Sequence, residues 1–135
     1  MRTLEVLLKR AKRDMEELAG NANRALAERN RVLTARASCE AATAAEANVI
    51  DGSPMSGLGF AAYLDKQKAR LAELDKEFVE VEAQHKSAKN ALMTAYAEVK
   101  KLEALIAQKK LHAVNERNAA EQNAFDERSA QMFRR

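Results

Sequence analysis

Apolar residues in the second half of the chain recur with the seven-residue period of a coiled coil. Steps of seven from Leu64 reach Leu71, Phe78, His85, Leu92, Val99 and Ile106, and a parallel row holds Leu74, Val81, Ala88, Ala95 and Leu102. Two such rows form one apolar stripe along a helix, because a helix completes a turn in about 3.6 residues. The pattern predicts a helix over about residues 59–133 whose stripe packs against another helix.

The first part of the chain carries a less regular stripe. One row with the same period consists of Leu4, Ala11, Leu18, Ala25, Val32 and Cys39. A neighbouring row is interrupted by Asp14, Asn21 and Glu28, which are poor residues for a packed interface. We therefore expect a helix over about residues 3–50, with a rougher packing face than that of the second helix.

A short break separates the two helices. The only proline, Pro54, and three of the four glycines lie within residues 52–59. Gly52 is suited to end the first helix, because it adopts a positive φ without strain, and Ser56 is a candidate cap for the second. These residues predict a loop over about residues 51–58.

A loop this short makes the helices antiparallel neighbours. The residue numbers of facing partners then sum to about 109, which places Val32 opposite Phe78 and Leu18 opposite Leu92. The predicted fold is all-α: one domain over residues 1–135, an antiparallel coiled-coil hairpin. Its interface is expected to include Leu4, Leu18, Val32, Leu71, Phe78, Leu92, Val99, Leu102 and Ile106.

The second helix is predicted to outrun the first. The first helix begins opposite about Ile106, and the stripe of the second fades at the same point, where Lys109, Glu116 and Asn123 take the next positions. Residues 107–135, called here the C-terminal extension, are expected to continue as a single helix without a partner inside the hairpin.

Composition supports a helical, non-catalytic protein. Aromatic residues make up 4%, Trp is absent, and the chain is rich in strong helix formers. The 23 basic and 20 acidic residues are interspersed along the chain, and this argues against a dedicated nucleic-acid binder. No segment is typical of a signal peptide or a membrane span, so a cytoplasmic protein is expected.

Catalytic and metal-binding patterns are missing from the sequence. His85 falls on the apolar stripe, and His112 lies one turn from Glu116, outside any H-E-x-x-H pattern. Cys39, the single cysteine, is expected to be a small buried residue. We therefore predict no enzyme activity, no catalytic or metal-binding residues, no cofactor and no small-molecule substrate.

Three groups of residues are candidates for binding partners, although the basic run can also be an ordinary solvated helix face and the aromatic cluster can simply cap the coiled coil near the loop. The three groups are the basic run Arg2, Lys9, Arg10, Lys12 and Arg13; the aromatic cluster Phe60, Tyr63 and Leu64; and the late group Glu121, Phe125, Asp126 and Glu127. Phe125 falls off the stripe, and an aromatic side chain on an unpaired helix favours a docking role.

The order of these features resembles the flagellar FliJ family over essentially the whole chain. Residues 60–64, FAAYL, are similar to the aromatic opening of that family's second helix, and residues 98–105, EVKKLEAL, to its K-x-L-E-x-L stretch. Glu121 followed by Phe125, Asp126 and Glu127 is similar to its late E…L-D-E element, with Phe125 where Leu is usual.

The resemblance implies a component of the flagellar type III export apparatus, at the cytoplasmic face of the inner membrane. Family members are coiled-coil stalks that bind and activate a hexameric export ATPase, contact the export-gate membrane protein and escort export chaperones. By this resemblance the basic run and the late group would meet the ATPase, and Phe60, Tyr63 and Leu64 would meet the gate or chaperones. A monomer in solution, without nucleic acid, is expected.

Three other functions are compatible with the sequence. The injectisome counterparts of the family, which serve virulence secretion, share the same architecture. An unrelated structural coiled coil, acting as an adaptor or a homodimeric spacer, would show the same composition. A basic helical binder of nucleic acid or of anionic membranes is the third, against which the interspersed glutamates argue.

Overall fold

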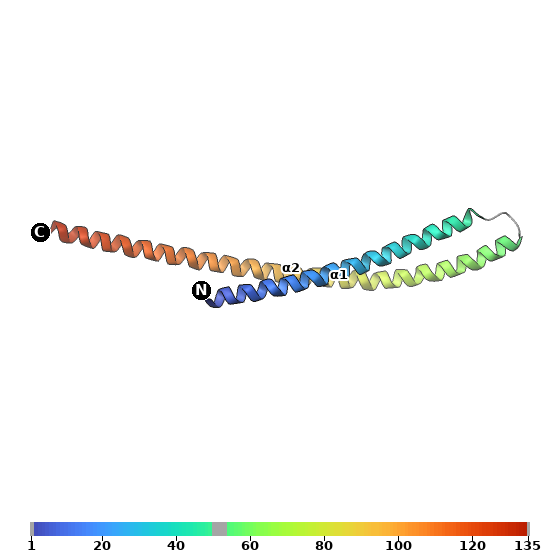
Figure 1. The fold of residues 1–135 in the computed structure, drawn as a ribbon, viewed down its shortest axis with the longest axis horizontal. Helices are drawn as coiled ribbons and strands as arrows, with labels where there is room; N and C mark the ends of the chain where they lie inside the picture. The colour runs from blue at the N-terminus through green and yellow to red at the C-terminus, as the bar shows by residue number, and fades with distance from the viewer. Residues whose placement is uncertain (1, 50–53, 135) are drawn as a thin grey trace. The chain divides into compact units, whose positions relative to one another are not determined.

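The chain folds into two long helices, as the computed structural model shows for residues 2–49 and 54–134 (Figure 1). Helix α1 spans Arg2–Ala47 and helix α2 spans Pro54–Phe133. Within these described residues there is no strand. The two helices pack against each other in antiparallel directions, so the predicted all-α hairpin is confirmed.

The predicted start of the second helix is wrong. Helix α2 begins at Pro54 rather than near residue 59, so residues 54–58 of the expected loop are helical. Proline is favoured in the first helical turn, because its φ angle is already helical and its missing N–H has no partner there. Ser56 consequently lies inside the helix rather than before its first residue, while the proposed role of Gly52 falls outside the described residues.

Helix α1 ends slightly earlier than predicted, at Ala47 rather than near residue 50. The turn beyond it is closed by two backbone hydrogen bonds. The amide of Asn48 donates to the carbonyl of Ala44 at 3.3 Å, and that of Val49 donates to Glu46 at 3.1 Å. These bonds satisfy carbonyls that the last turn of a helix otherwise leaves without a partner.

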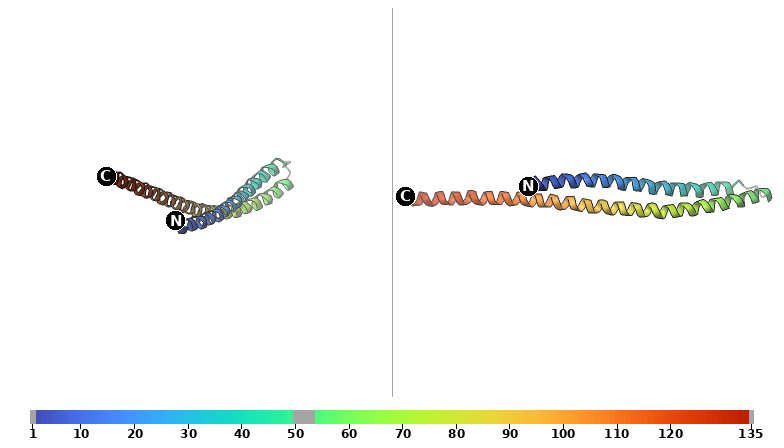
Figure 2. Two further views of the ribbon diagram at one scale, coloured as in Figure 1. Left: turned by 60° about the vertical axis from the view of Figure 1, so that its left-hand side comes forward. Right: turned by 90° about the horizontal axis from the view of Figure 1, so that it is seen from below.

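The chain divides into two units, each built from a part of both helices. The first unit comprises Met1–Glu16 with Thr94–Arg135, and the second comprises Glu17–Met93. In the second unit the two helices lie side by side in every view (Figures 1 and 2). Its core cluster consists of Val32, Cys39, Leu74 and Val81, with Ala35, Leu71 and Phe78 packed against it.

Cross-helix contacts in the second unit agree with the register expected from the sequence. The residue numbers of the partners sum to 111 for Arg29 and Glu82, 108 for Arg31 and Glu77, and 106 for Cys39 and Gln67. These sums bracket the expected value of about 109. The register expected from the position of the loop is therefore the register of the fold.

Three arginines of α1 hold acidic residues of α2 in the second unit. The pairs are Arg29 with Glu82, Arg31 with Glu77 and Arg36 with Asp75. Arg29 was not expected at the interface, yet it is half-buried, and its guanidinium lies 5.6 Å from the ring centre of Phe78. Arg29 follows Leu8, Met15 and Ala22 at steps of seven residues, so it lies on the packing face of α1.

Acid is expected to weaken the second unit. The hydrogen bond from Arg29 lowers the pKa of Glu82, and the hydrogen bond from Arg31 lowers the pKa of Glu28. Because a carboxyl with a depressed folded-state pKa stabilises the fold only while ionised, this stability is present at neutral pH and is lost as the pH falls below about 4.5. Thermal unfolding followed by circular dichroism over a pH series measures the loss.

Two matched variants test this acid effect. Glu82→Gln is expected to lower the Tm at neutral pH and to flatten its decline in acid, because the variant has no carboxylate to protonate at that position. Glu80→Gln removes a carboxylate from an exposed neighbouring position and should change neither. Identical pH profiles for the two variants would show that the Arg29–Glu82 pair contributes nothing.

In the first unit, the beginning of α1 covers one stretch of α2. Val99, Leu102 and Ile106 are buried there, and Leu7 and Ala11 share a hollow with Glu98 and Leu102. From residue 107 to residue 134 every residue is exposed except Ser129, which is half-buried. The C-terminal extension therefore continues α2 to Phe133 without cover from α1, as its fading stripe predicted (Figure 1).

Candidate partner-binding surfaces

An exposed apolar row runs along the C-terminal extension. Leu111 is 62% exposed, Val114 41%, Phe125 64% and Met132 78%. Their separations of 3, 11 and 7 residues place them on one side of a helix with about 3.6 residues per turn. We call these four residues the extension face. Between Val114 and Phe125 the same side carries Asn118 and Glu121, so the face consists of two exposed apolar groups, and such groups on an unpaired helix favour a binding role.

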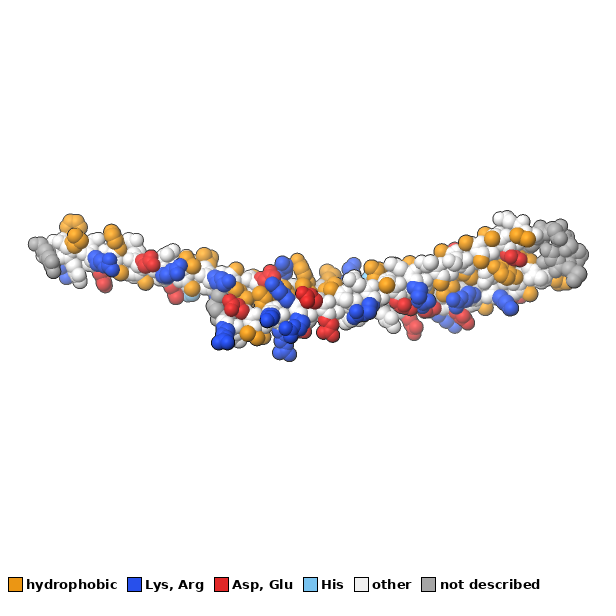
Figure 3. All heavy atoms as spheres, viewed as in Figure 1, with side chains coloured by type: hydrophobic (Ala, Val, Ile, Leu, Met, Phe, Trp, Pro, Cys, Tyr) orange, Lys and Arg blue, Asp and Glu red, His pale blue; other side chains and the backbone are white. Residues whose placement is uncertain are grey.

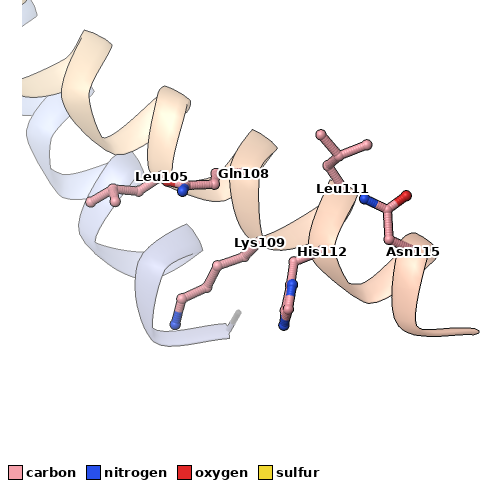
Figure 4. Close-up of a pocket in the computed structure, with 6 residues that line it drawn as sticks. All are labelled: Leu105, Gln108, Lys109, Leu111, His112 and Asn115. Carbon is pink, nitrogen blue, oxygen red and sulfur yellow. The ribbon is translucent and has the colours of Figure 1, made fainter.

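A hollow of about 470 Å³ lies along the beginning of the extension face. It is lined by Leu105, Gln108, Lys109, Leu111, His112 and Asn115. Figure 4 shows Leu111 and Asn115 on one side of α2, and Lys109 and His112 on the other. The hollow thus offers an apolar contact flanked by a cation and by an amide that can donate or accept hydrogen bonds.

Polar side chains accompany the extension face. Asp126 accepts a hydrogen bond of 3.1 Å from the amide nitrogen of Gln122, one turn earlier. Imidazole Nε2 of His112 lies 3.0 Å from a carboxylate oxygen of Glu116. Glu121 and Glu127 are exposed. Of the residues predicted for this region, Phe125 and its acidic neighbours are therefore all accessible to a partner.

The basic run lies entirely on the surface of α1. Arg2, Lys9, Arg10, Lys12 and Arg13 are all exposed, and a shallow hollow around Val6 is lined by three of them: Lys9, Arg10 and Arg13. Figure 3 shows Lys and Arg side chains along this part of the molecule, with Asp and Glu side chains among them. We call these five basic residues with Val6 the cationic face. It belongs to the first unit, as does the extension face.

The aromatic cluster is more enclosed. Phe60, Tyr63 and Leu64 are all half-buried, and the rings of Phe60 and Tyr63 are stacked with their centres 6.4 Å apart. The hydroxyl of Tyr63 accepts a hydrogen bond of 2.9 Å from the side-chain amide of Gln67. That amide also donates to the carbonyl of Cys39, so the cluster is tied to α1. These residues contribute to the packing of the second unit as well as to its surface.

The residues considered for chemistry are not assembled into a site. His85 is half-buried on the interface, and Cys39 is buried in the core cluster. Within residues 2–49 and 54–134, no group of three or more potential metal-ligating side chains comes together. Nor does any helix in the described part of the chain have the length and hydropathy to cross a membrane.

Sequence reasoning missed most of the extension face. It found Phe125 but not Leu111, Val114 or Met132, because it followed the seven-residue period of the hairpin stripe, which fades beyond Ile106. These three residues could have been recognised by their helical spacing relative to Phe125, once the apolar residues of the hairpin interface had been set aside.

Comparison with protein families decides which of the compatible functions applies. The family model described as Flagellar FliJ protein matches residues 1–135. The chain belongs to this family. No curated protein and no solved structure matched the chain. Membership makes it a flagellar protein related to export that interacts with the export apparatus, and this favours the flagellar function over the injectisome and over an unrelated spacer.

Proposed function

We propose that this FliJ-family chain is a stalk that binds and activates the hexameric export ATPase, links it to the export gate and escorts export chaperones. The observation that carries the proposal is the extension face, which lies on a single helix without cover from α1. A lone helix is about 10–12 Å across, which is narrow enough to enter the centre of a ring of subunits. The apolar row supplies the contact area inside such a ring.

The cationic face supports the same assignment. Its five basic residues lie in the unit that also carries the extension face. Arginine and lysine form charge-assisted hydrogen bonds with carboxylates, so acidic loops of the ATPase are suitable partners. We propose that Glu121, Asp126 and Glu127 make the complementary contacts with basic groups of the ring.

We assign the second unit to the gate and chaperone contacts. Phe60 and Tyr63 form a stacked aromatic pair, and both residues remain partly accessible. Aromatic residues are frequent anchors of protein interfaces, because they bury a large area with few rotatable bonds. A monomer in solution, carried from partner to partner, is consistent with this division of surfaces.

A photo-crosslinking amino acid placed in the full chain tests the ATPase contact. Position 125 lies on the extension face, and position 79 carries an exposed valine in the second unit. We expect position 125 to form covalent adducts with the purified export ATPase, and position 79 to form none. Adducts at position 79 but not at position 125 would contradict the assignment of the extension face to the ATPase.

A further inference from the structure

The basic residues of α1 differ between the two units in whether they form ion pairs with α2. In the second unit Arg29, Arg31 and Arg36 each pair with a carboxylate of α2. In the first unit, none of the five basic residues of the cationic face takes part in an ion pair or side-chain hydrogen bond with the described residues. Their charge is therefore available to an external anion.

The fold also separates charges that are interspersed in the sequence. Residues 1–16 and 94–135 hold 13 Lys and Arg against 9 Asp and Glu, whereas residues 17–93 hold 10 against 11. The first unit is thus cationic and the second is close to neutral. A polyanion is therefore attracted more strongly to the first unit, and the cationic face presents five exposed basic residues of that unit.

An apolar side chain lies among these cations. Val6 is 62% exposed, and the neighbouring Leu7 is 43% exposed. Arg2, Val6, Lys9 and Arg13 are spaced by 4, 3 and 4 residues, so they share one side of α1. Basic side chains around a protruding aliphatic residue suit the boundary between lipid headgroups and acyl chains, where the cations meet phosphates and the aliphatic group is buried.

We propose that the cationic face binds the surface of an anionic phospholipid bilayer. A bilayer fits better than a nucleic acid, because the face has no aromatic side chain on which a base could stack, and its aliphatic residues gain nothing from phosphate. The exposed aliphatic side chain of Val6 among these cations is a group that acyl chains can bury, whereas an acidic protein loop has no need of it. This lipid contact goes beyond the stalk function and does not depend on it.

Lipid binding has a consequence for the proposed stalk. The cationic face is the surface assigned to the acidic loops of the ATPase, and one face cannot contact a bilayer and a ring at once. Anionic lipid would therefore compete with the ATPase for the chain, and the strength of this competition would fall with rising salt, because both contacts depend on exposed charges.

Co-sedimentation of the full chain with lipid vesicles tests the proposal. We expect binding to vesicles that contain phosphatidylglycerol, none to vesicles of phosphatidylcholine alone, and a loss of binding as salt rises. The combined variant Lys9→Gln, Arg10→Gln and Arg13→Gln should bind about 100-fold more weakly, because each basic residue near an anionic surface contributes about 1 kcal/mol and 1.4 kcal/mol is tenfold.

A matched variant separates this face from overall charge. Lys66→Gln, Lys68→Gln and Lys89→Gln together remove the same charge from exposed positions of the second unit, and this variant should bind almost as well as the unaltered chain. Equal losses in both variants would overturn the proposal. So would the absence of binding to phosphatidylglycerol vesicles at low salt, or binding to a short DNA duplex without binding to the vesicles.

Discussion

Val81→Asp is expected to lower the Tm by about 15 °C, because it places a charge without a partner in the interface between the helices. Val81 is 6% exposed and belongs to the core cluster of the second unit. Loss of a buried aliphatic side chain together with burial of an unpaired carboxylate costs about 4 kcal/mol. For a chain of this size, 1 kcal/mol corresponds to about 4 °C in Tm.

Val79→Asp provides the matched control for this prediction. It makes the same substitution two residues earlier on the same helix, at a position that is 70% exposed. We expect the Tm to remain within about 2 °C of that of the unaltered chain, as is usual for surface substitutions. Thermal unfolding followed at 222 nm measures both variants, and equal shifts would mean that Val81 does not face α1.

Removing the apolar character of the C-terminal extension is expected to shift activation of the ATPase to much higher concentrations of the chain. The variant combines Leu111→Gln, Val114→Gln and Phe125→Gln, and Gln preserves the helix because it is a good helix former. These side chains are exposed and lie beyond Ile106, the last buried residue of α2, so folding should not change. Loss of three interface residues at about 1 kcal/mol each raises the concentration needed for half-maximal activation about 100-fold.

The control variant removes equally exposed apolar residues from the second unit. It combines Val49→Gln, Leu58→Gln and Val79→Gln, at positions that are 73%, 74% and 70% exposed. We expect activation of the ATPase to be unchanged. An equal loss of activation in both variants would mean that general surface hydrophobicity, and not the extension face, governs binding.

The hairpin and its register could be predicted from the sequence because they follow from one periodic pattern. Leu74, Val81, Val99, Leu102 and Ile106 recur at coiled-coil spacing, and all five are buried in the fold. A long helix has few ways to bury such a stripe, and a short loop leaves the antiparallel arrangement as the simplest. The same stripe therefore predicts which residues are buried and, together with the short loop, which residues of the two helices face each other.

Features that depend on individual side chains were less predictable. Arg29 lies in a row of apolar residues, and only the presence of Glu82 and Phe78 across the interface explains why a charged residue is accepted there. The start of α2 at Pro54 was not predictable, because an isolated proline is common both in a loop that ends a helix and in the first turn of a helix.

The candidate surfaces were also predictable only in part. The sequence indicates Phe125 and the basic run, because an aromatic residue on a polar helix and a cluster of like charges can both be recognised from neighbouring residues alone. It cannot tell which cations lack a partner, because this depends on the carboxylates that α2 brings opposite each turn of α1. The contrast between the paired Arg36 and the unpaired Arg10 appears only in the fold.

The most direct test of the proposed stalk function is the steady-state rate of the purified export ATPase over a concentration series of this chain. We expect a saturable increase in rate with the unaltered chain and with the control variant of the second unit. For the variant of the extension face we expect an increase shifted to about 100-fold higher concentration. A rate that stays constant over the whole series of the unaltered chain would contradict the proposed stalk function.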